Sequence, residues 1–160
     1  MNADLIARGL SPYDPDSVSM EAGRIALERI RHLIKTKQSF TWETTMSGRT
    51  AVSWLREAKN SGYQIKCWLL WVANVDTTLS RIRHRVNEGG HNIDIDVSRR
   101  RFIKTIQNFL SIYRPLCDAW KLIADDIQAP RLLALQKNGK LVVRDAKAIE
   151  KINRETGVIV

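Results

Sequence analysis

The chain contains 160 residues, of which 44% are apolar and 27% charged, and its formal net charge is +9. This length suffices for one hydrophobic core but not for two independent ones, so we expect a single domain spanning residues 1–160. The positive charge favours anionic partners in general, from nucleotides to nucleic acids, without choosing among them. The longest apolar stretch, residues 67–73, is too short to cross a bilayer, and the two cysteines have neither disulfide nor metal-site spacing. We therefore expect a cytosolic protein without a membrane partner or a metal ligated by its side chains.

The first part of the chain predicts two amphipathic helices separated by a strand. Apolar residues recur at helical spacing over about residues 17–37, with Asp16 or Ser17 as the expected N-cap. The segment 39–44 is rich in β-branched and aromatic residues and predicts a strand. After a short turn, a second helix is predicted over about residues 50–60.

The middle of the chain predicts a buried strand followed by two helices. Residues 63–72 are almost continuously apolar, as expected of a central strand covered on both faces. Helices are predicted over about residues 76–86 and 97–112. The pair Gly89-Gly90 separates them as a hinge.

The last part of the chain predicts a short strand, a hairpin and a terminal helix. The strand lies within residues 120–127, the hairpin turns at Asn138-Gly139, and the helix begins near Asp145. Strands that alternate with helices predict an α/β fold, with a mostly parallel sheet and helices on both of its faces.

Acidic side chains stand at two positions where α/β proteins commonly bind ligands. Asp4 would lie at the carboxyl edge of the sheet if a strand preceded it, where its carboxylate could accept a hydroxyl proton. Taken alone, an aspartate near a terminus is more often a solvated residue or a helix cap. Glu43 lies near the end of the strand predicted over 39–44, and Thr45 and Arg49 add a hydroxyl and a positive charge on the substrate side. Alternatively, Thr45 and Ser47 merely cap the following helix, and Glu43 pairs with a lysine.

Two basic stretches flank the glycine pair. Arg81 and Arg85 lie one helical turn apart on one face, and Arg100 and Arg101 begin the next helix. A guanidinium group binds phosphate oxygens bidentately, so the segment 81–101 could close as a lid over the phosphates of a nucleotide. Charge runs of this kind are also common on solvated helix faces. A nucleic-acid stripe is a poorer interpretation, because the intervening aromatic residues follow core spacing.

Four motifs follow one another in an order known from one family. They are NADLIARGLSP from Asn2, EAGR from Glu21, FTWETTMSGR from Phe40, and RVNEGGH with the later RRRF from Arg85. This combination resembles the zeta-toxin-like P-loop kinases, in particular the branch labelled predicted ABC-type ATPases. The resemblance covers nearly everything from Asn2 to about residue 120.

The resemblance implies a kinase that uses ATP or GTP with Mg²⁺ to phosphorylate a hydroxyl group of a small molecule. It implies UDP-N-acetylglucosamine as a candidate acceptor and an antitoxin protein as a partner. Asp4 matches the carboxylate that takes the hydroxyl proton, while Glu43 and Thr45 match an acid and a hydroxyl that bind the acceptor. Arg85 matches a lid arginine that stabilises the transferring phosphoryl group, and Arg81 is expected beside the nucleotide with it. The less close matches are Arg100 and Arg101 in the lid and Glu21 on the acceptor side.

The sequence departs from the family in one respect. These 160 residues contain no Walker A motif, GxxxxGK[ST], and the pair Gly139-Lys140 lies in the predicted hairpin. A Walker A loop supplies backbone amides and a lysine for the phosphates and a hydroxyl for Mg²⁺. We therefore expect a P-loop-kinase-like three-layer sandwich that lacks the first strand, the P-loop and the first helix, with Met1 at the end of the family's second strand.

Without those parts, this chain is expected not to transfer phosphate. Two alternatives remain open. One is a noncatalytic remnant that binds an antitoxin or a nucleotide sugar, and the other is a basic nucleic-acid-binding protein.

Overall fold

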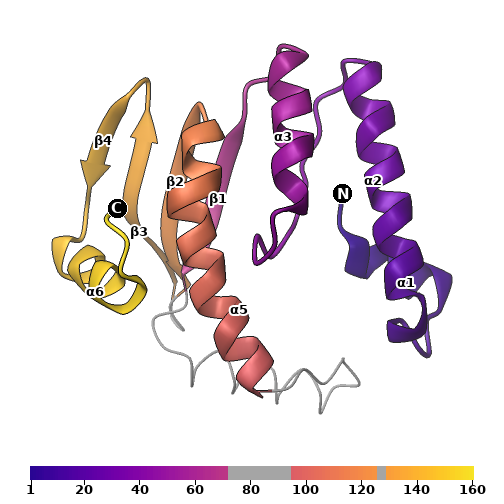
Figure 1. Cartoon of the computed structure of the whole chain (residues 1–160), viewed down its shortest axis with the longest axis horizontal. Helices are drawn as coiled ribbons and strands as arrows, with labels where there is room; N and C mark the ends of the chain where they lie inside the picture. Colours follow the sequence, from indigo (N-terminus) through magenta and orange to yellow (C-terminus); the bar gives the residue numbers. More distant parts are fainter. Residues whose placement is uncertain (72–94, 126–128) are drawn as a thin grey trace. The chain divides into compact units, whose positions relative to one another are not determined.

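The computed structural model describes residues 1–71, 95–125 and 129–160. These residues form two compact units (Figure 1). The first unit contains Met1–Thr45 and Asn60–Gly62, and the second contains Met46–Lys59 and Tyr63–Val160. The single kinase domain expected over residues 1–160 stays a prediction. In the part of the chain that is described, no helix is long and apolar enough to span a membrane.

The first unit consists mainly of two helices that pack together. Helix α1 (Ala3–Leu10) contacts α2 (Ser19–Lys35), and a 3₁₀ turn, η1 (Asp16–Val18), precedes α2. The predicted helix over 17–37 is confirmed, and its apolar positions form one buried face that includes Ala22, Ala26, Ile30, Leu33 and Ile34. The predicted cap is wrong. Because the 3₁₀ turn delays the start of the helix, Val18 occupies the N-cap position and makes no side-chain cap bond.

The segment 39–44, predicted as a strand, is assigned no strand in the structure. The first residue of the chain nevertheless binds its backbone. The amino group of Met1 donates to the carbonyl oxygen of Thr41, and the amide of Glu43 donates to the carbonyl oxygen of Met1 at 2.9 Å. These two bonds flank Trp42 in the pattern of a parallel pair. The pairing does not extend into a ladder, because α1 begins at Ala3 and turns the chain away.

The second unit contains a four-stranded sheet in the order β1-β2-β3-β4. Strand β1 (Lys66–Trp71) pairs parallel with β2 (Ala119–Asp125), whereas β3 (Pro130–Lys137) pairs antiparallel with both β2 and β4 (Lys140–Val143). The fold is therefore α/β as predicted, but the sheet is mixed rather than mostly parallel. The physical reason is the shortness of the connections after β2, since parallel neighbours need a crossover of about a dozen residues or more.

The hairpin between β3 and β4 turns where the sequence predicts. Asn138 and Gly139 both have positive φ, at 52° and 73°, which matches the two central positions of a type I′ turn. Lys137 and Lys140 form the last pair of the ladder. Asparagine and glycine tolerate this backbone better than other residues, so local turn chemistry sets the register of the hairpin.

Strand β1 lies at an edge of the described sheet. Its side chains alternate, with Cys67, Leu69 and Trp71 buried, while Trp68 is 70% exposed and Leu70 is 58% exposed. The prediction of a central strand covered on both faces is therefore wrong for the described residues. An apolar run shows that a strand can be covered, but it does not show which other segments cover it.

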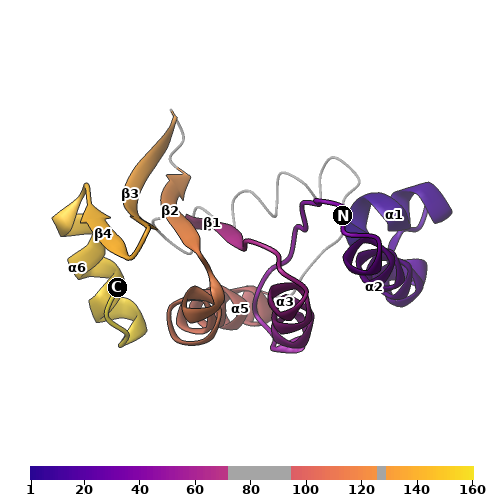
Figure 2. The same ribbon diagram turned by 90° about the horizontal axis from the view of Figure 1, so that it is seen from above.

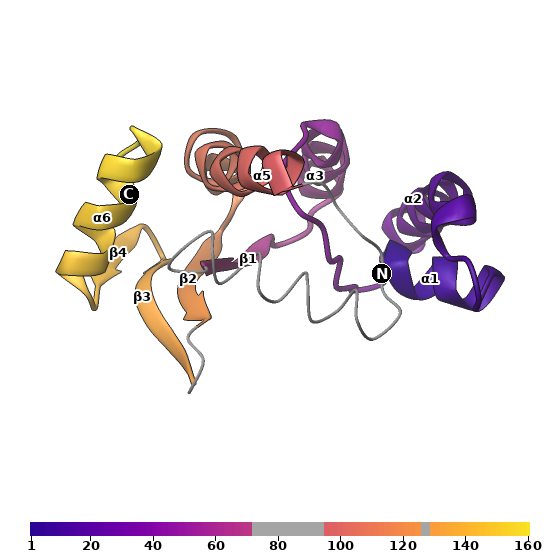
Figure 3. The ribbon, with the colours of Figure 1, turned by 90° about the horizontal axis from the view of Figure 1, so that it is seen from below.

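Helices pack on the sheet of the second unit. Figures 2 and 3 show α3 (Thr50–Asn60) and α5 (Ile95–Asn108) on the same face of the sheet. A short π-helix, η2 (Phe109–Tyr113), and a 3₁₀ turn, η3 (Arg114–Leu116), continue α5 toward β2. The ring of Phe109 meets Trp120 edge-on, with 5.7 Å between the ring centroids, in the centre of this core.

The predicted helices at 50–60 and 97–112 are confirmed in type, and the terminal helix is α6 (Ala146–Thr156). Asp145 is its N-cap, and its carboxylate accepts the amide of Ala148 at 3.0 Å. The helix predicted over 76–86 and the Gly89-Gly90 hinge lie outside the described residues.

Candidate functional site

The first unit brings two of the sequence motifs together around Asn2. The side-chain amide of Asn2 donates to Oε2 of Glu43 at 2.7 Å. The side-chain oxygen of Asn2 accepts the amide of Leu5 at 3.1 Å and so caps α1. Both ends of one amide group are thus used, one to start a helix and the other to bind Glu43. With the backbone bonds of Met1 to Thr41 and Glu43, this contact holds the start of α1 beside the segment that contains Glu43.

The two predicted carboxylates, Asp4 and Glu43, are both accessible. Asp4 lies in the first turn of α1, two positions after Asn2, and is exposed. The amide groups at the start of a helix favour a negative charge there. Glu43 is also exposed, so a ligand can reach it although Asn2 already binds one of its oxygens. We name Asn2, Asp4 and Glu43 the acidic site.

The remaining predicted residues of the first unit lie on other segments of it. Thr45 follows Glu43 by two positions and is exposed. Glu21 lies in the first turn of α2 and is exposed as well. Their roles in acceptor binding, like those of Asp4 and Glu43, stay predictions.

The predicted arginines belong to the second unit or to the part of the chain that is not described. Arg49 immediately precedes α3, and Arg100 and Arg101 lie on α5; all three are exposed. Arg81 and Arg85, and with them residues 81–94 of the candidate lid, lie outside the described residues. The convergence of these arginines on one phosphate therefore stays a prediction.

Two partly buried hydrogen bonds hold the loop that carries Arg49. The side-chain amide of Asn108 donates to the carbonyl oxygen of Met46 at 2.9 Å, and the hydroxyl of Tyr113 donates to the carbonyl oxygen of Gly48 at 2.7 Å. Met46 has a positive φ of 53°, which is uncommon for a residue with a side chain. The end of α5 and the helical turn after it thus hold the loop that leads to Arg49 and α3.

The predicted binding of a nucleotide with Mg²⁺ stays a prediction, because Arg81 and Arg85 lie outside the described residues. Gly139-Lys140, the sequence's glycine–lysine pair, lies in the tight turn between β3 and β4 rather than in a loop between a strand and a helix. In the described ranges, no group of three histidine, cysteine, aspartate or glutamate side chains could hold a metal ion.

Sequence reasoning missed one residue of the acidic site. Asn2 belongs to the motif NADLIARGLSP, yet the sequence patterns predict no role for its side chain. A local signal was available, because an asparagine just before a helical stretch with an acidic residue in its first turn is typical of an N-cap. The bond to Glu43 has no local signal, since 41 positions separate the two residues.

Comparison with known proteins finds a relative by sequence but no matching family model or solved structure. No family model matches the sequence, and no solved structure matches the chain. A protein of Haemophilus influenzae described as uncharacterized is 30% identical over 102 residues, which make up 64% of this chain and 73% of that protein.

Proposed function

This chain belongs to the family of the uncharacterized Haemophilus influenzae protein, and we propose that it binds the hydroxyl-bearing acceptor of a zeta-toxin-like kinase without itself transferring phosphate. The acceptor of this proposal is a nucleotide-activated amino sugar such as UDP-N-acetylglucosamine. A P-loop-kinase-like three-layer arrangement for the whole molecule belongs to the same proposal.

The observation that carries the proposal is the hydrogen bond between Asn2 and Glu43. It joins the motif NADLIARGLSP to the motif FTWETTMSGR, the two stretches that the resemblance assigns to the acceptor. The backbone hydrogen bonds of Met1 on either side of Trp42 also support the proposal, since they follow the pattern of two parallel segments. Although neither stretch is assigned as a strand, residues that follow two segments paired in this direction lie at the same edge, and ligands of α/β sheets bind at the corresponding edge.

The chemistry of the acidic site suits hydroxyl groups. Ionised carboxylates only accept hydrogen bonds, and sugar hydroxyls donate them. Asp4 and Glu43 are exposed and near one capped helix start, so they can accept from two hydroxyls of one ligand. Charge-assisted bonds of this kind are stronger than neutral ones. A carboxylate that holds a hydroxyl in this way is also placed to take its proton, which is the role that the resemblance implies for Asp4.

The expectation of no phosphate transfer concerns this 160-residue chain. It contains no Walker A motif, and phosphoryl transfer depends mainly on positioning and on stabilising charge with such a loop and its metal. ATP or GTP would therefore act only together with a phosphate-binding loop from outside these 160 residues. An antitoxin partner stays an expectation from the resemblance.

The test is isothermal titration of the purified chain with UDP-N-acetylglucosamine and, separately, with ATP and Mg²⁺. We expect the sugar nucleotide to bind and ATP not to bind measurably. In the double variant Asp4→Asn, Glu43→Gln the affinity for the sugar nucleotide should fall at least about tenfold, since each charge-assisted bond contributes about 1.5–3 kcal/mol before solvent exposure reduces it.

The matched control is Glu28→Gln, which removes an exposed carboxylate from α2 of the same unit. This variant should bind like the unmodified chain. No binding of the sugar nucleotide would reject this acceptor, and binding that the double variant leaves unchanged would reject the acidic site. Tight binding of ATP would show that a different nucleotide site exists.

A further inference from the structure

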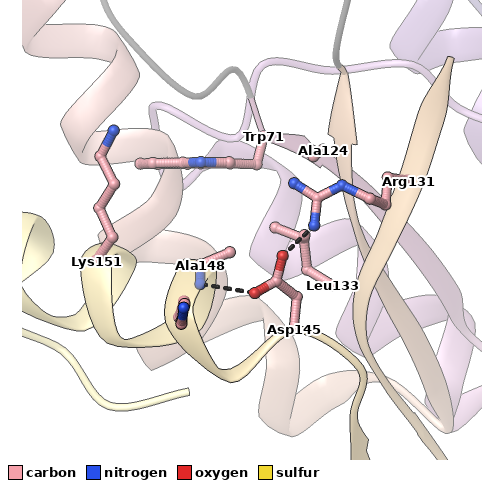
Figure 4. A pocket seen from close by; sticks show the side chains of 8 residues that line it. Trp71, Ala124, Arg131, Leu133, Asp145, Ala148 and Lys151 are labelled. Carbon is pink, nitrogen blue, oxygen red and sulfur yellow. Dashed lines mark hydrogen bonds and ion pairs between the residues drawn. The ribbon is translucent and has the colours of Figure 1, made fainter. Parts of the chain in front are cut away.

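A pocket of about 330 Å³ opens at the carboxyl end of the parallel strand pair in the second unit (Figure 4). Trp71, the last residue of β1, and Ala124, near the end of β2, line it from the sheet. Leu133 of β3 adds an apolar side chain, and all three residues are almost fully buried. The carboxyl end of parallel strands is where open α/β sheets bind ligands. The pocket therefore combines a favourable position with an apolar floor.

Charged side chains surround this floor. Arg131 enters from β3, and Lys147 and Lys151 enter from α6, opposite a single carboxylate, Asp145. In Figure 4, Lys151 and Arg131 lie on opposite sides of the Trp71 indole. With three cations and one anion, the formal charge of the lining side chains is +2.

The single carboxylate is already engaged. One oxygen of Asp145 accepts the amide of Ala148 at 3.0 Å, and the other forms an ion pair with Arg131. The hydrogen bond from the amide of Ala148 and the neighbouring Arg131 hold the pKa of Asp145 below its ordinary value. The carboxylate therefore stays ionised as the cap of α6. Outside the lining, Glu155 lies 3.7 Å from the ammonium of Lys151, in an exposed pair that water screens. Arg131 and Lys151 thus each have a carboxylate partner, and Lys147 adds a third cation to the lining.

We propose that this pocket binds a small organic anion, with its apolar body on the floor formed by Trp71, Ala124 and Leu133 and its charged group at Arg131, Lys147 and Lys151. The volume lies at the lower end of the range for small-molecule sites, which are mostly apolar with a few placed polar groups. A bare inorganic anion would leave the apolar floor uncovered, and a neutral ring would form no charge-assisted bond with Lys147. The pocket therefore calls for both features in one ligand.

The proposal is independent of the acidic site, because it uses none of the residues assigned to the acceptor. The lysines of the pocket lie on a helix whose start is capped locally by Asp145. The success or failure of this proposal is thus separate from that of the proposed function.

The experiment is a titration of the full chain with phenyl phosphate, followed by ¹H–¹⁵N NMR. Inorganic phosphate tests the charge without the apolar body, and benzyl alcohol tests the body without the charge. We expect phenyl phosphate to shift the amide signals around Trp71, Leu133 and Ala148, and to bind at least fivefold more tightly than either of the other two compounds. Equal affinity for phenyl phosphate and inorganic phosphate would overturn the proposal, as would shifts confined to other parts of the chain.

Two kinds of variant test the assignment of residues. The double substitution Lys147→Gln, Lys151→Gln should weaken phenyl phosphate at least fivefold, whereas Lys137→Gln, Lys140→Gln, which removes the same charge from the hairpin turn, should change affinity less than twofold. Ala148→Leu fills the pocket without changing any charge and should also weaken binding at least fivefold. If both pocket variants, folded by circular dichroism, bind phenyl phosphate like the unmodified chain, the proposal is wrong.

Discussion

The side-chain amide of Asn2 binds Oε2 of Glu43 at 2.7 Å, while its carbonyl oxygen caps α1 through Leu5. One residue thus joins the start of a helix to a carboxylate 41 positions away. The N-cap bond contributes to the free energy of unfolding, whereas the bond to Glu43 orients the carboxylate of that residue. These two contributions can be separated by substitution.

We predict that Asn2→Ala and Asn2→Ser differ in stability but not in ligand binding. Serine keeps an N-cap oxygen, and alanine does not, so Asn2→Ala should lose about 1 kcal/mol of unfolding free energy and Asn2→Ser only a few tenths. Both remove the amide that holds Glu43, so both should weaken UDP-N-acetylglucosamine by a similar factor, about three- to tenfold for one hydrogen bond. Urea unfolding and isothermal titration measure the two effects. Asn2→Ser binding at full affinity would show that Glu43 needs no positioning by Asn2.

A second prediction concerns Asp118, whose carboxylate joins the start of β1 to α3. Oδ2 of Asp118 accepts the amide of Ile65 at 2.8 Å, and Oδ1 lies 3.2 Å from Nζ of Lys59. The bond from Ile65, and then the interaction with Lys59, lower the pKa of Asp118. A carboxyl group with a lowered pKa in the folded state stabilises the fold at pH values above its unfolded pKa. That contribution is lost as pH falls through the folded pKa.

Asp118→Asn should therefore reduce the unfolding free energy by about 1 kcal/mol at pH 7, because the side chain is partly exposed and water weakens the bond. The difference between the variant and the unmodified chain should shrink as the pH is lowered from about 5 to about 2. Urea unfolding across this pH range measures it. Glu57→Gln, an exposed carboxylate on α3, is the control and should show no such convergence. A difference that stays constant with pH would contradict the assigned role of the charge.

The third prediction uses the same substitution at two glycines. Gly139 has φ of 73° in the hairpin turn, and Gly23 lies inside α2 without a positive φ; in both cases an added Cβ meets no atom within 4 Å. Gly139→Ala should destabilise the chain by about 1 kcal/mol, since alanine is strained in that backbone region. Gly23→Ala should stabilise it by about 0.5–1 kcal/mol, because alanine favours a helix. Thermal or urea unfolding measures both, and equal signs would refute the account.

The fourth prediction tests the core of the second unit. Phe109 is fully buried and its ring meets Trp120 edge-on. Phe109→Ala should lower the unfolding free energy by about 3–5 kcal/mol, through lost burial and a cavity, and Phe109→Leu by clearly less. Ile103, exposed on α5 one and a half turns earlier, offers a control in Ile103→Ala, which should cost under about 1 kcal/mol. Similar losses for Phe109→Ala and Ile103→Ala would mean that the ring pair is not the centre of this core.

Local structure was largely predictable from the sequence. The positions of α2, α3, α5 and α6 follow from apolar spacing, and the hairpin follows from Asn138-Gly139. The N-cap of α6 at Asp145 was close to its predicted start. These features depend on interactions between residues a few positions apart, so their determinants are present in a short stretch of sequence.

The pairing of distant segments was decided by the tertiary structure. The apolar run at 63–72 predicted a strand, but its place at the edge of the described sheet depends on β2 pairing with β3 as well. Likewise, segment 39–44 had the composition of a strand, yet it is assigned none: Met1 binds its backbone at Thr41 and Glu43, and the chain then turns into α1. The contact of Asn2 with Glu43 and the pocket between the sheet and α6 arise in the same way. Composition and periodicity determined which residues prefer a strand, a turn or a helix; the choice of partners required long-range contacts whose energy no local pattern contains.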